Sequence, residues 1–282
     1  MNTQIQNSHS VAEAAVRYAH LSDRSLALED LRRSAPAVFA EQASARTGRT
    51  YTFIPTGRVV AGLMDAGFVP VSARQTRSRG GVEHARHIVR LRRRFETVQL
   101  RDAVPEIVLL NSHDGTSAYQ LRAGLFRLVC LNGLLVSMGT LATIRVPHRG
   151  DVVDDVVTGA LTLSERFGEV GRYVEAMERR VLDDEERHAF ARAALALRFD
   201  AGVRAGLSSA DALQPRRAED GGSDLWRTYN VLQENVLRGG LVRRLPNGRI
   251  SRTRKITAIR EDVRLNAGLW ELAAGYVAPV VS

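Results

Sequence analysis

The adjacent residues His113 and Asp114 offer the most direct route to catalysis in this sequence. An imidazole and a carboxylate can both ligate a divalent metal ion, and a metal-bound water could then hydrolyse a phosphodiester. Further candidates for such a site are His84, His87, His148 and Asp151. No HExxH or similar signature accompanies them. His84 and His87 also lie three apart in a predicted strand, which places them on opposite faces.

The alternative interpretation of His113 and Asp114 is a structural turn. An Asp-Gly pair supplies a residue that tolerates positive φ, and an aspartate side chain can accept hydrogen bonds from nearby backbone amides. Asp114 is followed by Gly115. We therefore assign no catalytic residue, and His113, Asp114 and His148 remain candidate ligands of an unidentified metal.

Nucleophilic catalysis has little support in the sequence. Cys130 is the only cysteine and lies in the apolar run LVCL, where a buried, unreactive thiol is expected. Hydroxyl groups lie near His113 at Ser112, Thr116 and Ser117, but no GxSxG motif is present. A single cysteine also excludes an intrachain disulfide framework and a zinc site built on several thiolates. We expect no cofactor, and the balance favours a protein that is not an enzyme.

Positive charge is the broadest signal in the chain. Its 282 residues include 40 Lys and Arg against 31 Asp and Glu, a formal net charge of +9, and Lys255 is the only lysine. Arginine offers a planar fork that binds phosphate bidentately and can stack on bases. This balance favours an anionic polymer as partner, although a solvated basic surface is the simpler explanation.

The arginines are densest over residues 74–94 and 243–255. Arg122 and Arg127 are five apart, so in a regular strand they face opposite sides unless a bulge at Gly124 shifts the register. Several phosphate contacts would make binding sensitive to salt. The predicted nucleic-acid-binding residues are Arg77, Arg79, Arg86, Arg90, Arg92, Arg94, Arg122, Arg127, Arg252, Arg254 and Lys255.

The elements that must position these residues begin with a helical arm, residues 1–45, with a helix within residues 25–44. A strand follows, then a helix capped by Thr56 and closed by Gly67, and then two strands, the second with one strongly basic face. The three strands are expected over residues 50–55, 68–78 and 84–96.

Residues 105–147 show short apolar runs separated by turn signals at residues 113–116 and 131–134, which predicts an antiparallel meander. From Asp151 the periodicity becomes helical. Residues 207–223 are polar and contain Pro and Gly, so we expect an exposed connector.

A clear helix should run from a cap at Asp224 to a stop at Gly239. Trp226 and Tyr229 have the spacing of core residues, and the neighbouring amides could bind a partner or support the fold. These amides are Asn230, Gln233 and Asn235. A basic hairpin with an Asn-Gly tip and a last amphipathic helix, residues 261–277, complete the order.

Clustered strands followed by clustered helices define an α+β fold, in which an antiparallel β-meander sheet is backed by helices and the C-terminal half is helix-rich. We predict one domain over residues 46–277, β-rich over 50–150 and helix-rich over 151–277. No apolar run is long enough to span a membrane and no signal-peptide pattern begins the chain. We therefore expect a cytoplasmic protein without membrane association.

Three blocks of the sequence, NSHDGTSAYQLRAGLFRLVCLNGLL, IRVPHRGD and LWRTYNVLQENVLRGG, occur in this order. They resemble the phage- and plasmid-borne family catalogued as domain of unknown function 932, over roughly residues 45–277. The resemblance implies a role in the life of a mobile genetic element, with DNA handling as the expected task, and carries no catalytic residues. The predicted plan is also similar to that of single-strand annealing recombinases, a likeness of fold alone.

Three functional hypotheses follow. The first is a DNA-binding protein of a mobile element, an annealing or recombination accessory that favours single-stranded DNA, with residues 111–117 shaping part of its groove. The second is a metal-dependent nuclease or phosphohydrolase centred on His113 and Asp114. The third is a protein-binding inhibitor of a host defence system, whose basic surface meets an acidic protein. A homo-oligomer is compatible with each of them.

Overall fold

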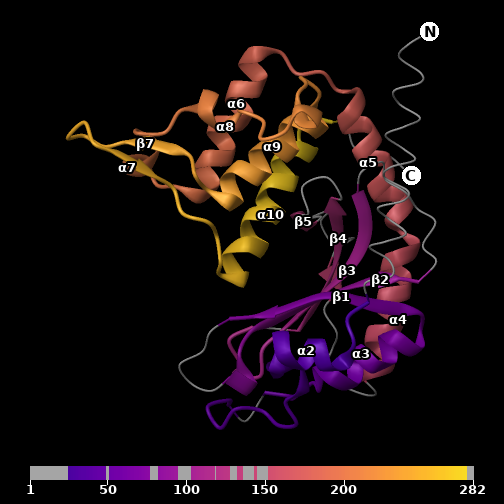
Figure 1. Ribbon diagram of the computed structural model, residues 1–282. Coiled ribbons are helices and arrows are strands. Elements are labelled where there is room, and N and C mark those ends of the chain that lie inside the picture. The colour runs from indigo at the N-terminus through magenta and orange to yellow at the C-terminus, as the bar shows by residue number, and fades with distance from the viewer. Residues whose placement is uncertain are drawn as a thin grey trace. The chain divides into compact units, whose positions relative to one another are not determined.

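The apolar runs between residues 68 and 144 pair into one antiparallel sheet (Figure 1). In the computed structural model the strands follow the order β1-β2-β3-β4-β5, and β6 pairs with β4. The described residues are 25–48, 51–76, 82–94, 103–117, 119–127, 132–135, 143–144 and 152–277. The strands are β1 (Phe68–Gln75), β2 (His87–Arg93), β3 (Ala103–Asn111), β4 (Gln120–Arg127), β5 (Asn132–Leu135) and β6 (Thr143–Ile144). The predicted meander and the α+β class are confirmed.

Helices cover this sheet. Their apolar residues recur with the helical period, so each helix has one apolar face that can pack against the core. The helical elements here are α2 (Leu28–Ser34), the 3-10 turn η1 (Pro36–Phe39), α3 (Thr56–Asp65) and α4 (Val152–Glu165). Val59, Val60 and Leu63 of α3 are fully buried. A Cβ at Gly62 would lie 2.8 Å from the side chain of Val153, so this glycine lets α3 and α4 approach closely. All nine residues of β3 are buried, which makes it the centre of the core.

Three local predictions in this part of the chain are wrong. Residues 51–55 form no strand, because their polar groups bond to loops and to β3 instead, as in the hydrogen bond from Asn111 Nδ2 to the Ile54 carbonyl. Thr56 is the first residue of α3 and caps nothing, since Pro55 precedes the helix and the Thr56 hydroxyl bonds elsewhere. The Asn-Gly pair of residues 132–133 lies in strand β5, where it pairs with β4.

The bulge considered at Gly124 is also absent, because the β3–β4 register is continuous through Glu106 and Gly124. The register shift lies in β1 instead, between Pro70 and Ser72. Proline lacks the N–H that a regular ladder uses, which is consistent with an irregularity at this place.

Helices dominate the rest of the chain, as predicted. They are α5 (Phe167–Arg179), α6 (Asp184–Arg198), α7 (Ala201–Arg204), α8 (Ser209–Ala212), η4 (Ala218–Asp220), α9 (Leu225–Arg238) and α10 (Ile259–Ala274). The central helix α9 contacts α6, α8 and α10. Its Tyr229 ring meets the Trp270 ring of α10 edge-on, with centroids 5.9 Å apart.

The ends of α9 and the hairpin after it follow the sequence signals closely. Asp224 caps α9 by accepting from the backbone N–H of Arg227 at 2.9 Å. Gly239 ends the helix with φ of 69°. The strands β7 (Val242–Arg244) and β8 (Ile250–Arg252) then form the expected hairpin, with Gly248 at φ of 77° in its turn.

Contacts between residues divide the chain into two compact units, Met1–Phe167 and Gly168–Ser282. The first contains the sheet, and the second contains α5 except for Phe167, the later helices and the hairpin. The single domain predicted over residues 46–277 stays a prediction beside this division into two units. Among the described residues no helix has both the length and the apolarity that crossing a membrane requires.

Candidate functional site

Two histidines of the N-terminal unit meet at one buried hydroxyl group. Thr56 Oγ1 lies 3.0 Å from His87 Nε2 and 3.5 Å from His113 Nε2, and it accepts from Asn111 Nδ2 at 3.0 Å. His87 Nδ1 lies 2.9 Å from the Ala85 carbonyl, which can only accept, so Nδ1 carries the proton and the Thr56 hydroxyl donates to Nε2. This network joins the start of α3 to β2 and to the end of β3.

Both imidazoles are held neutral in the interior. Burial lowers the pKa of His87 to about 4 against the opposing effect of the Ala85 carbonyl, and burial lowers the pKa of His113 to about 4 against that of Ala37. His87, His113 and Thr56 have no exposed surface. A substrate in solvent does not touch these groups, so the geometry supports a structural role for them.

Asp114 organises the turn that follows β3. Its Oδ1 accepts from the Thr116 backbone N–H at 3.0 Å and from the Thr116 hydroxyl at 2.6 Å. Burial alone would raise the pKa of Asp114, but the hydrogen bonds from Thr116 and Ser112, together with the Arg86 charge, bring it below its usual value. Arg86 Nη2 also donates to the Thr116 carbonyl at 2.6 Å. The turn interpretation of this pair is confirmed.

The metal-site prediction gains no support from the described residues, since they contain no group of three His, Cys, Asp or Glu side chains able to hold an ion. The imidazole of His113 lies at Thr56, whereas the carboxylate of Asp114 bonds Thr116. The candidates His148 and Asp151, and also Cys130, lie outside the described residues.

The basic face predicted for β2 is wrong, because two of its arginines are buried. Arg90 Nη1 donates to Glu106 Oε2 at 3.0 Å, and Arg92 donates to Glu106 Oε1 through Nε at 3.0 Å and Nη2 at 2.9 Å. Glu106, on β3, is fully buried. The Arg92 guanidinium also lies 4.7 Å from the centroid of the Phe126 ring. Arg90 and Arg92 therefore stabilise the interior of the sheet and present no charge to a phosphate.

The other arginines predicted around the sheet are dispersed. Arg94 is exposed at the end of β2, and Arg122 Nε donates to Gln120 Oε1 at 2.9 Å. Arg77 and Arg79, and the side chain of Arg127, lie outside the described residues. The described part of the sheet thus brings together no continuous patch of the predicted cations.

The amides of α9 support the fold, which decides between the two roles considered for them. Asn235 Nδ2 donates to the carbonyls of Ala212 and Gln214, both at 2.9 Å, and Gln233 Nε2 donates to Asn266 Oδ1 at 3.0 Å. Trp226 and Tyr229 are buried core residues, as predicted.

A buried carboxylate on α9 holds the segment before the helix. Glu234 accepts a hydrogen bond from Arg217 and forms an ion pair with Arg238 at 3.0 Å. Arg217 also pairs with Asp220 at 3.0 Å. Within the predicted connector, residues 207–223, Ala212, Leu213 and Asp220 are buried while most of the remaining residues are not.

Exposed positive charge is concentrated on the β7–β8 hairpin. Between Glu234 and Glu261 the chain has no acidic residue and eight cations: Arg238, Arg243, Arg244, Arg249, Arg252, Arg254, Lys255 and Arg260. We call residues 242–255 the hairpin arm. Figure 1 shows the two strands reaching out from the helices of their own unit. Its exposed cations are Arg244, Arg249, Arg252, Arg254 and Lys255.

The base of the hairpin arm is fixed by backbone contacts. Arg198 donates to the carbonyls of Val236 and Arg254. A Cβ at Gly239 would lie 2.6 Å from the Arg254 carbonyl carbon, so only glycine permits this approach. Leu207 forms an isolated bridge with Arg243. The cations are therefore presented by an anchored ribbon.

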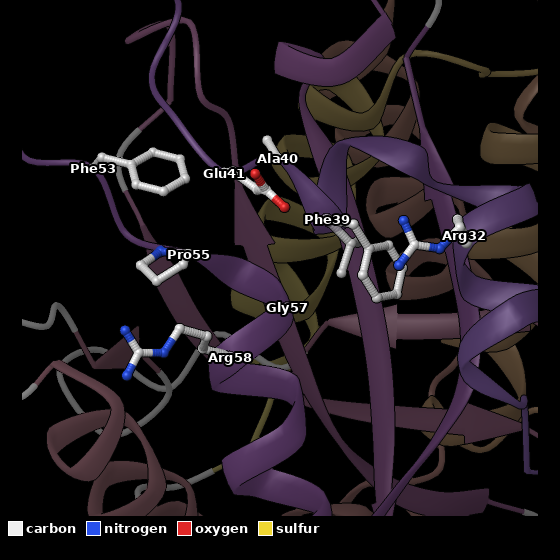
Figure 2. Close-up of a pocket in the computed structure, with 9 residues that line it drawn as sticks. Arg32, Phe39, Ala40, Glu41, Phe53, Pro55, Gly57 and Arg58 are labelled. Atoms are coloured by element: carbon white, nitrogen blue, oxygen red, sulfur yellow. The ribbon is translucent and has the colours of Figure 1, made fainter.

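The N-terminal unit also contains an open pocket that the sequence did not reveal (Figure 2). Its volume is about 620 Å³. Its walls come from α2, from η1 with the two residues after it, and from the segment before α3 with the first turn of α3. No sequence motif links these segments. The side chains that give it chemical character are Arg32, Phe39, Glu41, Phe53 and Arg58.

The chain belongs to the family described as "Domain of unknown function (DUF932)", whose sequence pattern matches residues 43–270. It is similar to UPF0380 protein YafZ of Escherichia coli (strain K12), with 43% identity over 253 residues, 89% of this chain and 91% of the relative. UPF0380 protein YfjQ of the same organism is 42% identical over 253 residues, with the same coverage. No solved structure matches the chain.

Proposed function

We propose that this protein binds nucleic acid through the hairpin arm, with single-stranded DNA as the favoured ligand. The observation that carries the proposal is the run of eight cations without an acidic residue between Glu234 and Glu261, of which six lie on the hairpin arm and five of these are exposed. A cytoplasmic location, where the chain would meet DNA, accompanies the proposal.

The pairing of the ribbon sets which cations act together. Val242 pairs with Arg252 and Arg244 pairs with Ile250, so these four side chains share one face of the hairpin. Arg244 and Arg252 are diagonal neighbours on that face and can contact neighbouring phosphates. Two-stranded ribbons are also narrow enough to enter the major groove of a duplex.

Single strands are favoured because the same face carries an apolar side chain. Ile250 is 64% exposed and lies between the cations. In a single strand the bases are unpaired and can contact such a side chain, whereas in a duplex they are stacked inside. Phosphate contacts would supply most of the binding free energy.

The test is the binding of labelled single- and double-stranded oligonucleotides, measured by fluorescence anisotropy from about 50 to 200 mM salt. The variant Arg244→Gln, Arg249→Gln, Arg254→Gln should bind at least about tenfold more weakly, because three phosphate contacts are lost. The control Arg172→Gln, Arg179→Gln, Arg192→Gln removes the same charge from exposed positions on α5 and α6.

Binding that the control retains and the arm variant loses supports the proposal. Absence of binding to either oligonucleotide at low salt would overturn it, and so would an equal loss in both variants. A duplex bound more tightly than the single strand would refute the strand preference.

A further inference from the structure

We infer that the pocket of the N-terminal unit is a binding site for a single nucleotide, either free or as an unpaired residue of a strand. This site goes beyond the proposed function, because none of its residues belongs to the hairpin arm. Its volume of about 620 Å³ lies within the range of small-ligand sites and cannot take a base pair with its two backbones.

Two aromatic rings supply surfaces on which a base can stack. Phe39 and Phe53 both line the pocket and both are partly exposed. The Phe53 ring rests against the buried His113 ring, with centroids 4.8 Å apart. The hydrogen-bond network around Thr56 therefore holds the surface behind Phe53 in place, and base stacking on a fixed ring loses little side-chain entropy.

Two guanidinium groups supply the charge for a phosphate. Arg32 and Arg58 line the pocket and are exposed, and the Arg32 guanidinium lies 4.3 Å from the centroid of the Phe39 ring. Figure 2 shows Arg32 beside Phe39 and Arg58 beside Pro55, and Pro55 lies between Arg58 and Phe53. An anionic ligand with a flat ring thus meets two aromatic rings and two guanidinium groups in one pocket.

Glu41 gives the pocket a preference among bases. Its carboxylate lies between the two aromatic walls in Figure 2 and can only accept hydrogen bonds. Guanine presents two adjacent N–H donors on one edge, which match the two oxygens of a carboxylate. Thymine presents one donor flanked by two carbonyls, which a carboxylate repels. The expected order of affinity therefore places guanine above thymine.

The experiment is calorimetric titration of the full chain with deoxyguanosine 5′-monophosphate, thymidine 5′-monophosphate and inorganic phosphate. We expect saturable binding of the guanine nucleotide, weaker binding of the thymine nucleotide and the weakest binding of phosphate. Phe53→Leu and Arg58→Gln should each reduce affinity by about fivefold or more. The control is Arg33→Gln, on α2 but outside the pocket.

Arg58 is exposed, so Arg58→Gln preserves the fold even if Phe53→Leu weakens it. A 5′-phosphorylated dinucleotide ending in guanine distinguishes a free nucleotide from an unpaired residue of a strand as the source of the ligand. If the source is a strand, the dinucleotide should bind at least as tightly as the free nucleotide. Failure of the wild-type chain to bind any nucleotide saturably would overturn the inference, as would equal affinities of the Arg58→Gln and Arg33→Gln variants.

This test is separate from that of the hairpin arm. The arm variant should bind the guanine nucleotide with unchanged affinity, and the Arg58→Gln variant should keep the salt-dependent oligonucleotide binding that the arm supplies. Failure of either experiment therefore leaves the other result standing.

Discussion

At the scale of single residues, the side chains best suited to catalysis form hydrogen bonds that stabilise the fold. His87 and His113 share the hydroxyl of Thr56, and Asp114 holds a turn. A buried polar group without a partner costs free energy, so these side chains depend on the partners that the fold brings to them. The meeting of Thr56, His87 and His113 in the fold therefore marks a structural junction.

The two buried histidines tie the stability of the protein to pH. Their folded pKa values near 4 lie below the unfolded value of about 6.5, so the unfolded chain binds more protons between these limits. The contribution of the two neutral imidazoles to the free energy of unfolding should be fully present above about pH 6.5. The free energy of unfolding should fall as the pH is lowered toward 4.

Urea unfolding at several pH values between 5 and 7 measures this decline. The double variant His87→Gln, His113→Gln should be less stable at pH 7 and should show a shallower dependence on pH. Stability of the wild-type chain that does not change over this range would contradict the assignment of two neutral, buried imidazoles.

The buried carboxylate of Glu106 gives a second prediction at this scale. Glu106→Gln leaves Arg90 and Arg92 buried without their counter-charge, and breaking a buried ion pair in this way costs about 3–5 kcal/mol. Chemical denaturation checks it, with the exposed Glu83→Gln as control. A loss no larger than that of the control would mean that the arginines do not depend on Glu106.

At the scale of elements, the features that could be predicted are those that a few neighbouring residues determine. The cap at Asp224, the stop at Gly239 and the hairpin tip at Gly248 are signals within a few residues, and the structure has all three. The burial of Arg90 was not predictable from its own strand, since its partner Glu106 lies on the next one. A lone carboxylate in the apolar run PEIVLLN was the one available signal.

Gly239 lies between α9 and the hairpin arm, and its contact with Arg254 gives a prediction about how the arm is positioned. Gly239→Ala puts a Cβ 2.6 Å from the Arg254 backbone at a φ of 69°, so both strain and a clash oppose it. The control Gly248→Ala has a similar φ of 77° but open space around its Cβ, and strain alone costs about 1–2 kcal/mol.

Thermal unfolding and oligonucleotide binding should therefore both suffer more from Gly239→Ala than from Gly248→Ala. Equal effects of the two substitutions would show that the approach of Gly239 to Arg254 does not position the arm.

At the scale of the whole molecule, the net charge of +9 is not spread evenly over the fold. The sheet uses Arg90 and Arg92 internally, whereas the hairpin arm exposes five cations. The sequence could give the excess charge but not its location, because burial depends on partners from other strands. The family match covers residues 43–270, which include both the sheet and the hairpin arm.

The salt dependence of single-strand binding tests the central claim most directly. The logarithm of the binding constant should fall linearly with the logarithm of salt concentration, and the slope should be about 2 units shallower in the Arg244→Gln, Arg249→Gln, Arg254→Gln variant. A wild-type slope near zero, or a slope that this variant leaves unchanged, would contradict binding of phosphates by the hairpin arm.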